Sequence, residues 1–202
     1  MHATGQVASA LVPATWSAKS LRRALNALLP DDIWVEDAEE VPLSFHARYD
    51  AVARCYRYRV GTEELACSPF HRHWCWPLAR PLDLPSMNTA AELILGEHSF
   101  LCFAKAGQPE RGDRCTVTRA SWTRWPDLGL EFRITANRFL HHMVRYLVGT
   151  MVDIGRERRP GTDMAALLAG TENVEASPPA PAQGLSLVAV AYDMNHTLNE
   201  DQ

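Results

Sequence analysis

Apolar positions along the chain show two spacings, which alternate from the amino terminus to about residue 192. Apolar residues three or four positions apart are typical of amphipathic helices, whereas alternation at every second position is typical of half-buried strands. Helices are predicted at 17–29, 86–95, from 138 to about 152, and at 162–169. Strands are predicted at 7–12, 33–38, 55–60, 116–125, 129–136 and 184–192. The elements interleave without a repeat or a clean parallel-sheet order, so the pattern predicts an α+β fold.

The helix predicted after Ala136 is the most informative element, because it places a cation on a segment otherwise built to be buried. Apolar residues recur at helical spacing from Phe139 to Val152. Arg138, His142 and Arg145 form a second stripe along the same predicted helix. An isolated cation at a buried position needs a partner. The stripe either presents cations to an anionic substrate or places Arg145 beneath a carboxylate held elsewhere in the fold.

The strand predicted at 55–60 has two different faces. Tyr56 and Tyr58 alternate with Arg57 and Arg59, and successive side chains of a strand point to opposite sides of the sheet. The aromatic side chains should therefore lie on one face and the arginines on the other. An aromatic residue in a strand is most often an ordinary sheet residue.

Composition favours a folded domain with locally concentrated positive charge. The chain has 202 residues, of which 47% are hydrophobic, and a net charge of −4, so it can bury a core as one domain or two intertwined halves. Basic residues gather in two stretches, namely Arg48, Arg54, Arg57 and Arg59, and then Arg156, Arg158 and Arg159. The second stretch is either a solvated surface or a contact with RNA phosphates.

Several features predict a cytoplasmic protein. No apolar run approaches the roughly 18 residues of a membrane span, and no basic segment followed by a long apolar core opens the chain. The odd count of five cysteines in a chain of this length favours reduced thiols in the cytosol.

Several motifs, in order along the chain, resemble those of the tRNA pseudouridine synthases of the TruA type. Residues 45–48 (FHAR) and 54–58 (RCYRY) are similar to the family's FHAR and RxYxY stretch, and residues 136–149 resemble its active-site helix. Residues 95–100 (LGEHSF) resemble the family's LxGxHDF turn, with Ser99 where aspartate is usual, and 180–187 resemble its APAxGLxL strand. The resemblance covers the chain from its first residue to about Tyr192.

The resemblance implies the pseudouridine synthase fold, in which helices flank a mixed central sheet shared by two related halves. The halves would be 1–60, incomplete here, and 61–192, followed by a frayed tail at 193–202. The implied reaction converts uridine to pseudouridine at positions 38 to 40 of the tRNA anticodon stem-loop. It needs no cofactor or metal, and the implied partners are tRNA and a second subunit of a homodimer.

The resemblance also implies roles for individual residues. Arg145 matches the arginine that pairs with the nucleophilic aspartate, and Tyr56 matches the tyrosine that packs on the target uracil. Five further residues are candidates for RNA contact, namely His46, Arg48, Arg57, Arg138 and His142. For His46 and Arg48 the alternative is a loop that only fixes the entry to the tyrosine strand.

The family's nucleophilic aspartate would lie upstream of Met1, since residues 1–7 (MHATGQV) look like the second half of the motif GRTDAGVHATGQV. Met1 stands where the family has valine, and GTG encodes valine but also serves as a bacterial start codon. We therefore expect a misassigned gene start, and we expect the chain as written to be inactive and poorly soluble.

Two other functions stay open at this stage. The chain could be a genuine short product that binds RNA without catalysis. Alternatively, Cys67, His71, His73 and Cys75 could bind zinc in an interaction module, although their spacing fits no common structural zinc site.

Overall fold

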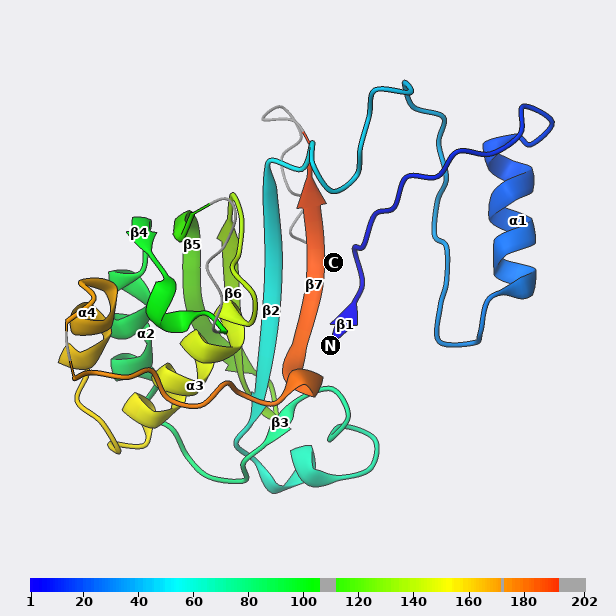
Figure 1. Cartoon of the computed structure of the whole chain (residues 1–202). Coiled ribbons are helices and arrows are strands. Elements are labelled where there is room, and N and C mark those ends of the chain that lie inside the picture. The colour runs from blue at the N-terminus through cyan, green and yellow to red at the C-terminus, as the bar shows by residue number, and fades with distance from the viewer. Residues whose placement is uncertain (106–111, 172, 193–202) are drawn as a thin grey trace. The chain divides into compact units, whose positions relative to one another are not determined.

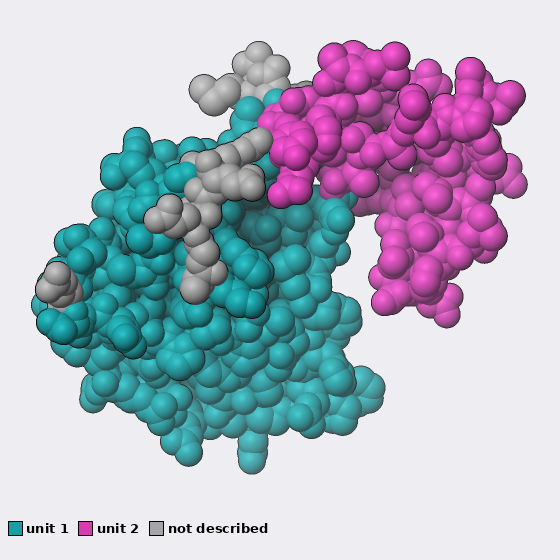
Figure 2. All heavy atoms as spheres, viewed as in Figure 1, with its two compact units in different colours: residues 1–6, 51–202 teal, residues 7–50 magenta. Residues whose placement is uncertain are grey.

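The computed structural model describes residues 1–105, 112–171 and 173–192, and the predicted tail at 193–202 lies outside them. The chain divides into two compact units (Figure 2): residues 1–6 together with the chain from residue 51 onwards form the first, and residues 7–50 form the second. The division at residue 60 was predicted from the two related halves of the family fold, and it stays a prediction.

The first unit is built on a mixed sheet (Figure 1). In spatial order its strands are β1 (His2–Ala3), β7 (Leu185–Ala191), β2 (Ala53–Gly61), β6 (Gly129–Ala136), β5 (Arg114–Trp125) and β4 (Gly96–Ser99). A further short strand, β3 (Trp76–Pro77), pairs with β2. The pairs β1–β7 and β2–β3 are parallel and the others are antiparallel. The sheet and its helices confirm the predicted α+β fold.

Three helices accompany this sheet, namely α2 (Leu84–Leu93), α3 (Met143–Gly155) and α4 (Thr162–Leu168), with short 3-10 turns η1 (Glu64–Cys67), η2 (Leu101–Phe103) and η3 (Ala182–Gly184). Helices α2 and α3 lie along one face of the sheet (Figure 1), and the apolar side chains between sheet and helices form the core. Tyr58 and Phe132 from the sheet, Met87 from α2, and Leu147 and Met151 from α3 are fully buried in it.

The predicted division of β2 into two faces is confirmed. Tyr58 and Val60 are fully buried on the core face, whereas Arg57 and Arg59 are partly exposed on the other. The register against β7 shifts between Cys55 and Tyr56, at a bulge.

The helix predicted from residue 138 begins later, at Met143. His142 has a left-handed backbone with φ of 67°, which the regular right-handed helix does not allow. The predicted stripe of three cations along one helix is therefore wrong: Arg145 lies in the first turn of α3, while Arg138 and His142 lie in the preceding connection.

The second unit contains α1 (Ala18–Leu28), which begins after Ser17. The Ser17 and Ser20 side chains cap it reciprocally, since each hydroxyl accepts a backbone N–H of the other residue. None of the residues of α1 is buried, and Leu28 is 83% exposed.

The strands predicted at 7–12 and 33–38 are not formed. A strand needs a neighbouring strand to satisfy its backbone groups, and Val35 finds another partner. Its N–H donates to Asn26 Oδ1 at 2.7 Å, and its carbonyl accepts from Asn26 Nδ2 at 2.9 Å. The amide of Asn26 thus takes the place of a paired strand.

None of the helices in the described part of the chain combines the length and the apolar character that a membrane crossing requires.

Candidate active site

Arg145 lies in the first turn of α3 and is held through one edge of its guanidinium. Its Nε donates to the carbonyl oxygen of Ala180 at 2.6 Å, and the N–H of Ala180 donates to the carbonyl oxygen of Arg145 at 2.9 Å. Among residues 1–105, 112–171 and 173–192, no carboxylate lies within ion-pair distance of this side chain. The two Nη groups are thus available for a forked contact with a carboxylate, which accepts two parallel hydrogen bonds from arginine.

Tyr56 lies in the middle of the sheet, between Ile134 of β6 and Leu187 of β7. Its half-buried ring meets Phe139 edge-on, with ring centroids 5.0 Å apart and an angle of 87° between the planes. Burial raises the pKa of the Tyr56 phenol, and the charge of Arg54 offsets this only in part. The phenol therefore keeps its proton at neutral pH, and Phe139 fixes the orientation of the ring.

Tyr58 links the strand of Tyr56 to the segment that holds Arg145. It follows Tyr56 by two positions on the same face of β2, and its hydroxyl donates to the carbonyl oxygen of Pro181 at 2.7 Å. Burial raises the pKa of Tyr58, while the nearby charge of Arg145 acts in the opposite direction. Tyr58 and Arg145 thus donate to neighbouring carbonyl oxygens of one segment, those of Pro181 and Ala180.

Strand β1 pairs with β7 at the edge of the sheet. Ala3 lies opposite Leu187, which in turn lies opposite Tyr56. Because β1 and β7 are parallel, the chain before Ala3 runs back along β7 toward Leu185, and the segment with Ala180 immediately precedes that end of β7.

Arg57 does not face the same side as Tyr56. It lies on the opposite face of the sheet, where Glu131 Oε2 is 3.7 Å from its Nε and 2.9 Å from that of Arg59. Arg133 Nε donates to Glu131 Oε1 at 2.8 Å, so three arginines share one carboxylate. Hydrogen bonds from Arg133 and Arg59 hold the pKa of Glu131 below its usual value even though burial alone would raise it. This arginine cluster, Arg57, Arg59 and Arg133 around Glu131, carries a net positive charge.

Arg138 and His142 lie between β6 and α3. Arg138 has a partner, and its charge lowers the pKa of Asp113. Desolvation, with the neighbouring charges of His141, Arg145 and Lys105, lowers the pKa of His142. His142 is therefore a neutral hydrogen-bonding group at pH 7 rather than a cation.

His46 and Arg48 belong to the second unit. The N–H of His46 donates to Asp50 Oδ2 at 2.7 Å, and the N–H of Arg48 donates to His46 Nδ1 at 3.1 Å. These bonds build a turn around His46, and the Arg48 guanidinium lies 5.7 Å from the centre of the Tyr49 ring. Both side chains are exposed.

A carboxylate also lies at the turn where sequence reasoning noted a departure from the family pattern. Ser99 Oγ donates to Asp113 Oδ2 at 2.5 Å, and the N–H of Phe100 donates to the carbonyl oxygen of Asp113. The hydrogen bond from the Ser99 hydroxyl holds the pKa of Asp113 below its usual value. Asp113 thus supplies a carboxylate from the loop before β5. Sequence reasoning missed it because the two residues are 14 positions apart.

The residues proposed for zinc do not form a metal site in the described part of the chain, where no three metal-ligating side chains come together. The thiol of Cys75 is buried and points to the carbonyl oxygens of Ala66 and His71, at 3.7 and 3.5 Å. Cys67 and His73 are exposed.

Comparison with known proteins assigns this mixed sheet with its helices to the pseudouridine synthase class. A family model described as tRNA pseudouridine synthase matches residues 90–193. The chain belongs to this tRNA pseudouridine synthase family.

Known tRNA pseudouridine synthases are similar in sequence to this chain over nearly its whole length. A tRNA pseudouridine synthase A of Bacillus velezensis is 39% identical over 193 residues, which cover 96% of this chain and 77% of the relative. The proteins of the same name from Geobacillus kaustophilus and Moorella thermoacetica are 38% and 40% identical, over 96% and 95% of this chain and 74% and 77% of their own lengths.

Proposed function

We propose that this protein isomerises uridine to pseudouridine in tRNA, at positions 38 to 40 of the anticodon stem-loop, in the cytoplasm. Membership of the tRNA pseudouridine synthase family supports the reaction. The observation that carries the proposal is the forked edge of Arg145, held in place by Ala180 and free of any carboxylate among the described residues.

The reaction explains why such an arginine is useful. The bond between the ribose and nitrogen 1 of uracil breaks, the base turns, and a new bond forms between the ribose and carbon 5. Nitrogen 1 gains a proton and carbon 5 loses one, so the product is an isomer and no electrons are exchanged. A nucleophilic carboxylate must be kept ionised and aimed at the substrate, and a forked contact with arginine favours both.

Tyr56 suits the second task, which is to hold the detached base. A base that has left the RNA stack can pack on an aromatic side chain, an interaction of about 1–3 kcal/mol. Because burial raises the pKa of the phenol, Tyr56 is a weak candidate for removing the proton of carbon 5. The edge-on contact with Phe139 orients the ring and favours a stacking role.

The proposed nucleophile is the aspartate of the family motif GRTDAGVHATGQV, whose second half residues 1–7 resemble. The forked edge of Arg145 is the proposed partner of its carboxylate.

We further propose that the protein binds tRNA as a homodimer. The arginine cluster offers charge for the RNA backbone, and Arg138, His46 and Arg48 are the other candidate contacts, with His142 as a neutral hydrogen-bonding group. Sedimentation analysis with and without tRNA tests the assembly, since a monomer that binds one tRNA would contradict it.

The test of activity measures tritium released from tRNA labelled at carbon 5 of uridine, because only isomerisation at a labelled uridine removes that atom. We expect release by a chain that carries the complete family motif GRTDAGVHATGQV. Replacing each of uridines 38, 39 and 40 with cytidine locates the reaction. A chain with this motif that binds tRNA but releases no tritium would instead support a non-catalytic RNA-binding function.

A further inference from the structure

A stiff connector carries the backbone oxygen that holds Arg145. It spans residues 174–181 and leads through η3 into β7. Pro178, Pro179 and Pro181 surround Ala180 within it, and proline fixes φ near −65°. Since so few backbone angles are free, the place of the Ala180 oxygen depends on where the rest of the connector is anchored.

Several contacts seat the connector along α3. The N–H of Ser177 donates to Oγ1 of Thr150, which follows Arg145 by five residues in α3, at 3.2 Å. The oxygen of Pro178 lies so close to Gly149 that an added Cβ there would be 2.2 Å from it. The paired bonds between Ala180 and Arg145 complete the row. The connector therefore follows α3 from Thr150 back to Arg145.

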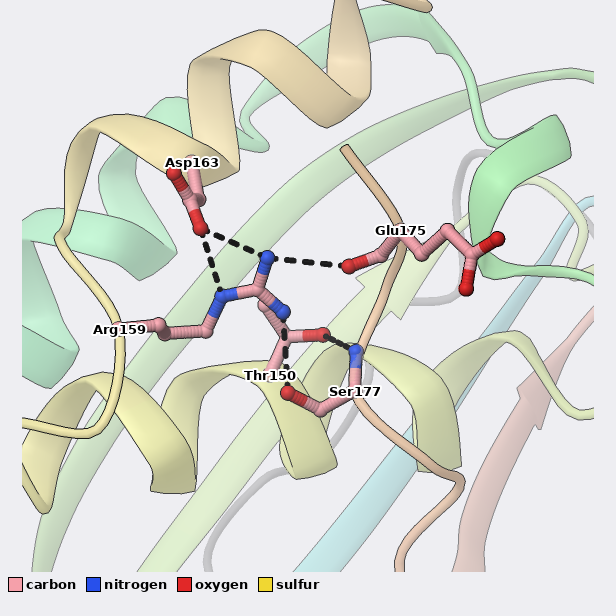
Figure 3. A network of polar contacts seen from close by, with 5 residues as sticks. All are labelled: Thr150, Arg159, Asp163, Glu175 and Ser177. Atoms are coloured by element: carbon pink, nitrogen blue, oxygen red, sulfur yellow. Dashed lines mark hydrogen bonds and ion pairs between the residues drawn. The ribbon is translucent and has the colours of Figure 1, made fainter. Parts of the chain in front are cut away.

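Arg159, in the loop between α3 and α4, grips the far end of this connector (Figure 3). Its Nη2 donates to the carbonyl oxygen of Glu175 and its Nη1 to Ser177 Oγ, both at 3.0 Å. Its Nε and Nη2 also donate to Asp163 Oδ2, at 3.1 and 2.8 Å. The Arg159 side chain is only 13% exposed. All three nitrogens of Arg159 donate hydrogen bonds within the protein, so the side chain has a structural role and is not a free cation for RNA.

We infer that Arg159 is a positioning residue that sets the orientation of the Arg145 guanidinium through the connector. The path runs from Arg159 to Ser177, across the two prolines to Ala180, and from the Ala180 oxygen to Nε of Arg145. The role of this orientation in catalysis rests on the proposed function. The dependence of the Arg145 orientation on Arg159 does not. The competing role of Arg159 is to anchor α4 through Asp163.

Two substitutions separate these roles. Arg159→Lys keeps a cation for Asp163 but cannot reach Glu175 and Ser177 together, because an ammonium lacks the planar fork. Asp163→Asn removes the charge of the ion pair and leaves both bonds to the connector. Ser177→Ala deletes only the hydroxyl that Nη1 reaches. Arg158→Ala is the matched control, since Arg158 is 56% exposed and its ion pair to Asp153 is 3.9 Å long.

The readout is nuclear magnetic resonance of the protein, in which the Nε–H signal of Arg145 is identified by its loss in Arg145→Lys. We expect Arg159→Lys and Ser177→Ala to shift this signal and to speed hydrogen exchange at the Ala180 amide by about tenfold or more. Amides of β6 should be unchanged. Asp163→Asn and Arg158→Ala should leave the Arg145 signal in place.

Two outcomes would overturn the inference. One is an Arg145 signal that moves in neither Arg159→Lys nor Ser177→Ala, and the other is a shift of the same size in Asp163→Asn. If the proposed function holds, Arg159→Lys in the active enzyme should also lower kcat by about ten- to a hundredfold with little change in KM. Spectra in which the Arg145 signal does not respond to Arg159→Lys or Ser177→Ala contradict the positioning role. An Arg145 variant that still forms pseudouridine contradicts the proposed function instead. The two failures are therefore distinguishable.

Discussion

Arg145 and Ala180 hold each other through two hydrogen bonds, one from Arg145 Nε to the Ala180 oxygen at 2.6 Å and one from the Ala180 N–H to the Arg145 oxygen at 2.9 Å. The pair joins the first turn of α3 to the segment that leads into β7. It leaves the outer edge of the guanidinium directed away from its own backbone partner, which is the arrangement that a carboxylate clamp requires.

Replacement of Arg145 by lysine in the active enzyme should abolish most turnover while preserving tRNA binding. An ammonium cannot both bond Ala180 and grip a carboxylate with two parallel bonds. We expect kcat to fall by about a hundredfold or more and the Kd for tRNA to change by less than about threefold. Tritium release and filter binding measure the two quantities. Turnover within a few fold of the parent would remove Arg145 from the reaction.

Two substitutions of Tyr56 should differ in their effects. Phenylalanine keeps the ring that packs on Phe139 and should retain turnover within about tenfold, whereas alanine removes stacking worth about 1–3 kcal/mol. Pseudouridine yield under single-turnover conditions checks both. Equal losses in the two variants would show that the hydroxyl, rather than the ring, has the essential role.

Glu131 should make folding stability depend on pH. Its pKa is lowered in the folded protein, so its contribution is complete above the pKa of the unfolded chain, about 4.3, and is lost as the pH falls through the lower folded value. Glu131→Gln leaves three arginines without their carboxylate and should cost about 2 kcal/mol at pH 7.

Urea denaturation at pH 7 and pH 3 measures this dependence. The stability difference between the parent chain and Glu131→Gln should shrink as the pH falls below about 4. A difference that is the same at both pH values would contradict the assigned ion-pair role.

Gly149→Ala should destabilise the protein although alanine is the better helix former. The new Cβ would lie 2.2 Å from the Pro178 oxygen, so either the connector or α3 must move. The clash should exceed the roughly 1 kcal/mol gain in helix propensity and give a net loss of about 1–3 kcal/mol. Gly161→Ala is the control, because among the described residues only the chain neighbours of Gly161 can lie within 4 Å of the added Cβ. A more stable Gly149→Ala variant would mean that the connector is looser than described.

Helix α1 should be weakly protected in the 202-residue chain. It has 11 residues and none is buried, and isolated helices of this length are marginal in water. Hydrogen exchange should be fast at its amides and slow at those of β2 and β6, the central paired strands. Slow exchange throughout α1 would show that its exposed apolar residues are covered in solution, for example by a second copy of the chain.

The local periodicity of the sequence was enough to place most of the elements around the site. Alternation between Tyr56, Tyr58 and the intervening arginines predicted the two faces of β2, because successive side chains of any strand point to opposite sides. The ranges of β6 and α4 were predicted closely, since each combines a clear apolar period with a Gly or Pro boundary. Motif resemblance singled out Arg145 and Tyr56.

Periodicity failed where a local contact competed with regular structure. The left-handed residue His142 delays α3 to Met143, and the amide of Asn26 satisfies the backbone of Val35 in place of a strand. Neither the backbone conformation of His142 nor the hydrogen bonds of Asn26 change the apolar spacing from which the elements were predicted.

By itself the sequence determined the alternating elements, the two faces of β2 and the family to which the chain belongs, because these depend on residues that are neighbours in the chain. Tertiary structure alone decided that Ala180 holds Arg145, that Asp113 meets Ser99, and that Arg159 clasps the connector. These contacts join residues 35, 14 and 18 positions apart, with the last measured from Arg159 to Ser177. Hydrogen-bonding partners so distant in sequence become neighbours only when the sheet and helices pack, and no local pattern specifies which of many donors will meet which acceptor.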